Sequence, residues 1–266
     1  MNRAVRTQQL EIMNVLAFFA HPDDAEFLCA GSLAHLADRG AKIRIVTMTA
    51  GDCGSAVLPA TRIARLRLRE AHRAAKIIGA ESSCLFERDL NIFYDKRSLA
   101  KVMEAVRAAD PTLVFTHSPV DYMVDHETAS RLCQTACFGA MAPNFRTGMQ
   151  PAAKPLRAVP HLYYAQPFGG RDILGHEIPS SIFVDISGTS ARKEQMLACH
   201  ESQRAFLSAQ QGISDTIGMA RAMATRAGSV AGWEQAEGFR QHLGQGFPQD
   251  DALRRLLGEL VRHIEA

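Results

Sequence analysis

The chain has 266 residues, of which 47% are hydrophobic and 22% charged, and its formal net charge at pH 7 is +2. It is long enough for a sizeable core and lies near the upper limit for one domain. No run approaches the roughly 20 apolar residues of a membrane span, and so mild a positive charge does not indicate a nucleic-acid partner.

Residues 1–13 are expected to form a polar arm. The arm has neither a long apolar segment nor a small-residue cleavage site, so no secretory signal is predicted and a cytoplasmic location is expected. The six cysteines form no C-x-x-C pair. They are therefore expected to be reduced structural thiols rather than zinc-finger ligands.

Strands and helices are predicted to alternate through the first 120 residues. From apolar runs, alternation and helical spacing, strands are expected at 15–20, 42–48, 83–86 and 113–116, and helices at 27–39, 62–78 and 99–108. This alternation predicts an α/β fold with a Rossmann-like, mostly parallel sheet and helices on both faces. Ligands bind at the carboxyl ends of such strands, so the residues that follow them should converge on one rim. These residues are His21, the 51–54 loop, Asp89 and His117.

The second half of the chain is expected to complete a single domain spanning 1–266. Residues 141–159 contain three prolines and are expected to form a long surface loop, which could serve as a lid. The remaining elements expected are strands at 162–165 and 181–186, helices at 127–138 and 191–207, and two or three helical pieces after Ser214.

The first candidate site is the turn His21-Pro22-Asp23-Asp24, directly after an apolar strand. Catalytic zinc takes three protein ligands from His, Asp, Glu or Cys and leaves a position open for water. His21 and Asp24 could reach one ion if the chain turns at Pro22, and Asp23 would then point elsewhere in the pocket. Adjacent aspartates after a proline are also common turn formers, so spacing alone leaves a purely structural turn open.

The third ligand has to come from another loop. His126 is the best candidate because it begins a helix just after a strand. Its neighbour Asp125 could orient an imidazole or bind substrate. A free carboxylate such as Asp23 could take a proton from activated water and pass it to a leaving group, which suits amide hydrolysis.

These motifs resemble those of the PIG-L/LmbE-like deacetylases, zinc-dependent enzymes that remove N-acyl groups, mostly from N-acetylglucosamine-containing substrates. The run Ala20-His21-Pro22-Asp23-Asp24 resembles the signature of the family. Further resemblances lie in order along the chain at Thr49–Gly54, Arg67–Glu70, Asp89, 110–117, Asp125-His126, 193–203 and 236–239.

The resemblance implies roles for individual residues. His21, Asp24 and His126 would bind one Zn²⁺, although iron or cobalt could occupy the same ligand set. Asp23 would be the general base and then the proton donor to the leaving amine. The substrate-binding residues would be Arg67, Asp89, Asp125 and His200. The implied partner is a small N-acylated molecule, and a homo-oligomer is plausible.

Two positions depart from the family pattern. Ala25 separates Asp24 from the acidic residue Glu26, and Met123 stands where many members have a histidine that assists the oxyanion or leaving group. Either Asp23 works alone with zinc or another group supplies that role, with His200, His117 and Tyr122 as candidates. The departures suggest a divergent subgroup with a substrate other than a standard N-acetylglucosaminide.

Three functions therefore remain open. The first is a zinc-dependent hydrolase that removes an N-acyl group, with acetyl expected first, from an amino sugar. The second is an amidase acting on a non-sugar or thiol-sugar conjugate. The third is a nucleotide-binding protein without enzyme activity, which is opposed by the absence of both G-x-G-x-x-G spacing and a P-loop sequence.

Overall fold

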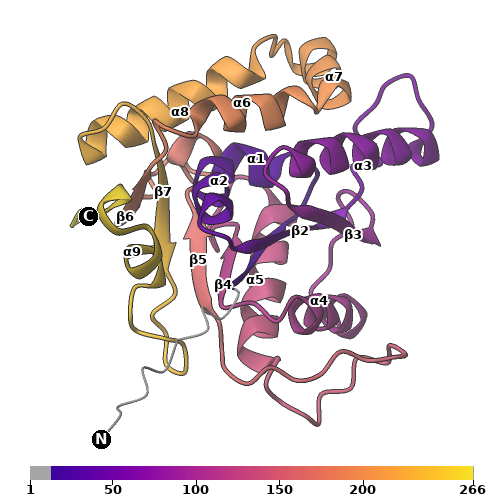
Figure 1. Cartoon of the computed structure of the whole chain (residues 1–266). Coiled ribbons are helices and arrows are strands. Elements are labelled where there is room, and N and C mark those ends of the chain that lie inside the picture. Colours follow the sequence, from indigo (N-terminus) through magenta and orange to yellow (C-terminus); the bar gives the residue numbers. More distant parts are fainter. Residues whose placement is uncertain (1–12, 266) are drawn as a thin grey trace, which may run out of the picture.

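A mixed sheet forms the centre of the protein (Figure 1). The computed structural model describes residues 13–265, so most of the expected polar arm lies outside the described residues. Within the described part, the sheet has eight strands in the order β3-β2-β1-β4-β5-β7-β6-β8. The strands are β1 (Asn14–Phe19), β2 (Lys42–Thr49), β3 (Glu81–Glu87), β4 (Leu113–Thr116), β5 (His161–Ala165), β6 (Ile182–Asp185), β7 (Ala236–Gln241) and β8 (Val261–His263).

The first five strands are parallel, as predicted. Strand β7 is antiparallel to both β5 and β6, and β8 is antiparallel to β6. The α/β fold class and the mostly parallel sheet are therefore confirmed.

Helices cover both faces of the sheet (Figure 1). They are α1 (Asp24–Leu28), α2 (Ala30–Asp38), α3 (Ala60–Lys76), α4 (Lys96–Ala109), α5 (Val124–Gly139), α6 (Ser190–Ala198), α7 (Glu201–Gln211), α8 (Thr216–Ala231) and α9 (Ala252–Leu257), with short 3₁₀ turns η1 (Phe168–Gly170) and η2 (Gly258–Leu260). Alternate β1 residues enter two separate cores: Phe19 packs with α2 and α6, whereas Phe18 packs with α4 and α5. Such burial on both faces explains why β1 is a continuous apolar run.

The predicted helix at 27–39 is wrong in its boundaries. The chain becomes helical at Asp24, and a break at Cys29 separates α1 from α2. Glu237 on β7 accepts hydrogen bonds from the Gly31 and Ser32 N–H groups, so a distant carboxylate satisfies the first turn of α2. Lys193 lies 2.6 Å from the same carboxylate and compensates its charge.

The predicted helix at 191–207 is also divided, at Cys199-His200 between α6 and α7. Glu70 on α3 accepts a hydrogen bond from the Ser202 N–H at 3.0 Å and so satisfies a free donor in the first turn of α7. After both breaks, the new helix start is satisfied by an acidic residue more than 100 positions away, which local spacing does not reveal.

The tail after Ser214 contains strands as well as helices, so its prediction as helical pieces alone is wrong. Strand β7 has a polar sequence, AEGFRQ, yet its first four residues are buried. The pattern is not plainly apolar because one of the buried residues is Glu237. Its burial is possible because Lys193 compensates its charge.

The expectation of a lid at 141–159 does not fit the structure. Helix α5 starts at the carboxyl-end rim of the sheet and carries the chain to the opposite end, where the segment leads into β5 (Figure 1). The guanidinium of Arg107 donates hydrogen bonds to carbonyls at Ala140, Ala142 and Phe145 and holds the start of the segment against α4. None of residues 141–159 lines the site cavity described below.

None of the helices in the described part of the chain has both the length and the apolar character that crossing a bilayer requires.

The buried Lys193–Glu237 pair gives a stability prediction. Lys193→Met leaves the Glu237 carboxylate buried without its cation, so the free energy of unfolding should fall by about 3–5 kcal/mol in urea denaturation. The matched control is Arg221→Met, which removes an exposed ion pair with Glu194 and should leave the midpoint unchanged. Equal urea midpoints for both variants would contradict the stabilising role of the buried Lys193–Glu237 pair.

Candidate active site

Six of the sequence-predicted site residues line one cavity at the carboxyl ends of the parallel strands. The cavity has a volume of about 470 Å³, within the range of small-molecule sites. Its lining includes His21, Asp23, Asp24, Arg67, Asp89 and His126. Each arrives from a segment that follows a strand or, for Arg67, from the helix α3 that packs over the rim.

The turn after β1 separates its two aspartates. Asp23 has φ +100°, a left-handed conformation that strains a non-glycine residue. The Asp24 Oδ2 atom accepts a hydrogen bond from the His21 N–H at 2.7 Å and closes the turn. As a result, Asp24 faces the histidines while Asp23 lies 3.8 Å from the Arg67 guanidinium.

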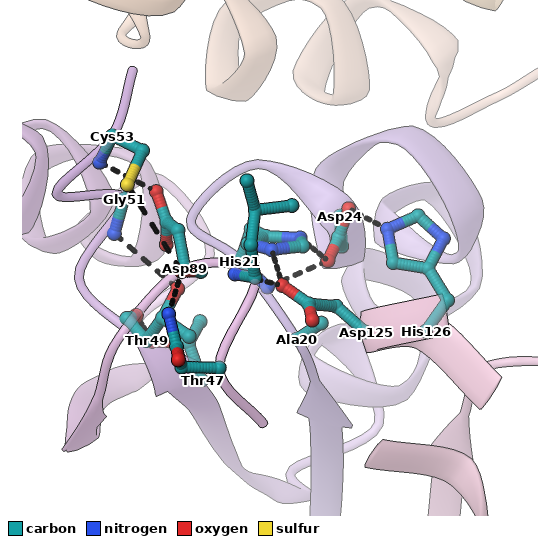
Figure 2. A network of polar contacts seen from close by, with 12 residues as sticks. Ala20, His21, Asp24, Thr47, Thr49, Gly51, Cys53, Asp89, Asp125 and His126 are labelled. Carbon is teal, nitrogen blue, oxygen red and sulfur yellow. Dashed lines mark hydrogen bonds and ion pairs between the residues drawn. The ribbon is translucent and has the colours of Figure 1, made fainter. Parts of the chain in front are cut away.

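His21, Asp24 and His126 converge with three donor atoms within 4.8 Å of one another (Figure 2). His21 Nδ1 lies 3.5 Å from Asp24 Oδ2, and His126 Nε2 lies 3.5 Å from Asp24 Oδ1. This nitrogen and oxygen set, supplied by buried or half-buried side chains, is of the kind that binds zinc.

The remaining ring nitrogens of both histidines are held by carboxylates. Asp125 Oδ2 lies 3.0 Å from His21 Nε2, and Asp121 Oδ1 lies 2.9 Å from His126 Nδ1. Such partners orient metal-binding imidazoles and direct the other nitrogen toward the ion. His21, Asp24 and His126 therefore fit a divalent metal, and Asp125 and Asp121 hold the two histidines in place.

The sequence predicted a role for Asp125 but none for Asp121. Asp125 also accepts the Leu90 N–H at 2.8 Å and does not line the cavity, so its placement fits the orienting alternative rather than substrate binding. Asp121 received no role from the sequence. The only signal was an acidic residue in the loop between β4 and the candidate ligand His126.

The charges of the cluster compensate one another. Burial by itself would lower the pKa of His21, but Asp125 and Asp24 raise it to about 10. Burial likewise opposes protonation of His126, whereas Asp24 and Asp121 raise its pKa. For Asp24, the effect of burial is outweighed by His126 and His117, which hold its pKa well below the usual range. The carboxylates thus favour positive charge in the cluster, which a divalent cation would also provide.

His117 lies beneath the cluster and is fully buried. Its ring stacks on His126 at a centroid distance of 3.9 Å, and its Nε2 accepts the Ala20 N–H at 3.0 Å. Burial and the neighbouring His126 lower the pKa of His117 to about 4, so it is neutral at pH 7. This position supports the cluster from below and does not face the cavity.

Asp23 is the carboxylate that remains free of the three-residue cluster. Burial raises the pKa of Asp23 to about 6, against the opposing effects of Arg67 and His200. A carboxylate with this pKa is ionised at pH 7 and close to the range that suits proton transfer.

The polar wall of the cavity contains Arg67 and Asp89. Arg67 donates to the Pro22 carbonyl at 3.0 Å, while its Nε lacks a hydrogen-bond partner among residues 13–265. Gly51, at φ +71°, permits this position because a Cβ there would lie 2.4 Å from the guanidinium. Asp89 Oδ2 accepts the Cys53 N–H at 2.8 Å, which leaves Oδ1 without a partner in the described part of the chain.

His200 lies behind the cavity wall. It is buried, with Nε2 3.3 Å from Glu26 Oε1, and it is not among the residues that line the cavity. Glu26 and Asp23 raise the pKa of His200 even though burial opposes this. The expected direct contact with substrate therefore does not fit this placement.

Two other groups of possible ligands are less suited to a metal. His117, Asp121 and His126 also come within 4.8 Å, but Asp121 is already engaged by His126. Asp52, Cys53 and Asp89 form the other group, in which Arg88 pairs with Asp52 at 2.9 Å. Partial desolvation and Asp52 raise the pKa of the exposed Cys53 thiol, which disfavours the thiolate that a metal would need.

The orienting contact from Asp121 can be tested directly. Asp121→Asn should weaken zinc binding about 10- to 100-fold, because the amide holds His126 less firmly and makes it less basic. Competition with a fluorescent chelator measures the affinity. Asp38→Asn, at an exposed pair with Arg192, is the matched control and should bind zinc like the parent chain. Parent-like affinity in Asp121→Asn would rule out this role.

Comparison with known proteins places the chain among relatives with the same fold. The family model described as PIG-L, GlcNAc-PI de-N-acetylase, matches residues 16–137. A 4-oxalmesaconate hydratase of Pseudomonas putida is 24% identical over 209 residues, which cover 76% of this chain and 78% of that protein. An uncharacterized deacetylase of Escherichia coli, YaiS, is 30% identical over 135 residues, covering 46% of this chain and 67% of that protein.

Among solved structures, N,N'-diacetylchitobiose deacetylase from Pyrococcus horikoshii superposes with a TM-score of 0.73. The match covers 87% of this chain and 84% of that chain at 22% identity, a level that supports the shared fold alone. The relatives include deacetylases and a hydratase. Together with the ordered motifs around His21 and His126, they show that the chain belongs to the PIG-L/LmbE-like deacetylase family.

Proposed function

We propose that the chain is a metal-dependent amide hydrolase that removes an N-acyl group from an amino sugar or a related small molecule. The observation that carries the proposal is the separation of two adjacent carboxylates. Asp24 belongs to a three-residue donor cluster, whereas Asp23 lies in the same cavity outside that cluster. Metal-assisted amide hydrolysis uses metal ligands together with a separate carboxylate that can act as the base.

His21, Asp24 and His126 would hold one Zn²⁺, and another divalent metal could replace it because the ligand set is not strongly selective. When bound, the ion would supply a Lewis acid that polarises a carbonyl and lowers the pKa of water to about 7. Asp125 and Asp121 hold the two imidazoles in the required orientation.

Asp23 would act as the general base. Its carboxylate takes a proton from the attacking water and later gives that proton to the nitrogen of the leaving amine. Arg67, next to Asp23, favours the ionised form that accepts the proton. The products are a carboxylic acid and a free amine.

The polar wall would bind the amine portion of the substrate. Asp89 Oδ1 is an acceptor without a partner among residues 13–265, which suits a hydroxyl donor such as that of a sugar. Arg67 Nε, on the same wall, is a donor that no other described residue engages.

Tyr122 would take the role of the histidine that many family members have at the position of Met123. Of the three candidates from the sequence, Tyr122 lines the cavity and His117 and His200 do not. Its ring meets His126 edge to face at 5.3 Å, next to the metal ligands. Partial burial, together with Asp24 and Asp121, raises the pKa of its phenol, so the hydroxyl keeps a proton to donate to an oxyanion.

A hydratase reaction is the second candidate, because one relative carries that activity. Among the described residues that line the cavity, Arg67 is the one arginine or lysine, against Asp23, Asp24 and Asp89. An anionic substrate or a nucleotide phosphate would therefore depend on the proposed metal for most of its charge compensation, whereas a neutral amide would not. A non-sugar amide remains a further alternative, and the cytoplasmic location, the single domain and a homo-oligomer remain predictions.

The roles of Asp23 and His126 can be separated by substitution. Asp23→Asn should keep one zinc per chain but lose about 10²- to 10⁴-fold in kcat, because only the proton shuttle is removed. His126→Ala should lose the metal. Elemental analysis and amine release from N-acetylglucosamine derivatives give the two readouts.

The control for both variants is Asp172→Asn, in an exposed hairpin away from the cavity, which should retain zinc and turnover. Undiminished turnover in Asp23→Asn would remove this residue as the base. Parent-like zinc content in His126→Ala would remove His126 as a ligand.

A further inference from the structure

The cavity has two sides of opposite chemistry. On the polar side, Asp89 Oδ1, Arg67 Nε and Gln203 Oε1 are buried atoms without hydrogen-bond partners among the described residues. These groups can meet the hydroxyls of a polar amine. They occupy only part of the lining.

The second side begins with a row of aromatic rings that leads away from the proposed metal ligands. Tyr122 packs against His126, Phe168 lies 6.3 Å from the Tyr122 ring, and Phe27 lies 5.8 Å from Phe168. All three aromatic residues line the cavity. The row therefore extends from the reacting centre to helix α1.

Helices α7 and α8 close the same side with aliphatic and aromatic groups. Phe206 and Leu207 come from α7, Ile213 from the connection, and Met219 from α8. The contact of Glu70 with Ser202 fixes the start of α7, and the Ile213 N–H donates to the Leu207 carbonyl at its end. These four side chains are only partly buried, so they present apolar surface to the cavity. Covering such surface is favourable in proportion to its area.

We propose that the acyl group of the substrate is a hydrocarbon chain of several carbons, larger than acetyl, that lies along this apolar side. The inference rests on the proposed amide hydrolysis and specifies its substrate. An acetyl group offers one methyl to a cavity of about 470 Å³ and would leave most of the apolar side in water. The amide C–N bond breaks, the water oxygen joins the acyl carbon, and one water hydrogen passes to the amine, so a fatty acid and an amine are released.

The test is a series of N-acylglucosamines with acetyl, butanoyl and hexanoyl groups, assayed with the zinc-loaded protein by amine release. Burial of a methylene corresponds to roughly a fourfold gain per group. We expect kcat/KM to rise at least about 30-fold from acetyl to hexanoyl. Equal or higher efficiency with acetyl would overturn the proposal and leave the amide hydrolase intact.

Two substitutions on one helix provide a matched comparison. Met219→Asn places a polar group on the apolar side and should lower the hexanoyl-to-acetyl ratio of kcat/KM about tenfold. Val230→Asn, also on α8 but 55% exposed and outside the cavity, should keep the parental ratio. A parental ratio in Met219→Asn would contradict the assignment of this wall.

A binding measurement separates failure of this inference from failure of the proposed function. If no N-acylglucosamine is hydrolysed, the proposed reaction fails. Calorimetric titration of Asp23→Asn with N-hexanoyl- and N-acetylglucosamine then decides the acyl inference alone. Tighter binding of the hexanoyl compound supports it, and equal or undetectable binding of both overturns it.

Discussion

The left-handed conformation of Asp23, at φ +100°, gives two neighbouring carboxylates different surroundings. Asp24 meets imidazoles, and the positive charge of His126 in particular lowers its pKa. Asp23 is buried beside Arg67 with its pKa raised to about 6. A regular strand or helix continuation would not place both side chains in the same cavity with such different partners. Two hydrogen bonds hold the strained turn. The Asp24 carboxylate accepts the His21 N–H, and the Arg67 guanidinium donates to the Pro22 carbonyl.

Buried acidic residues far away in the sequence position the elements around this turn. Glu237 holds the start of α2 next to α1, and Glu70 holds the start of α7 above the cavity. Each carboxylate satisfies backbone N–H groups that a helix start leaves free. These contacts connect the C-terminal half of the chain to the rim, so the apolar wall and the polar cluster belong to one cavity although they are far apart in sequence.

Local patterns were sufficient to predict β1 to β4 and the convergence of His21, Asp24 and His126, because strands of a parallel sheet present their carboxyl ends at one rim. Local patterns were insufficient to predict β7, because its buried Glu237 interrupts the apolar pattern of a strand. The role of Asp121 and the position of 141–159 also depend on how α5 runs in three dimensions. Periodicity describes one element at a time, whereas these features arise from contacts between elements.

The most direct test of the proposed metal centre is anomalous diffraction at the zinc absorption edge from crystals grown with one equivalent of zinc. We expect a single peak about 2.0–2.2 Å from donor atoms of His21, Asp24 and His126, with Asp23 outside bonding distance. A peak at Asp52, Cys53 and Asp89 instead, or no peak in a folded protein, would contradict it.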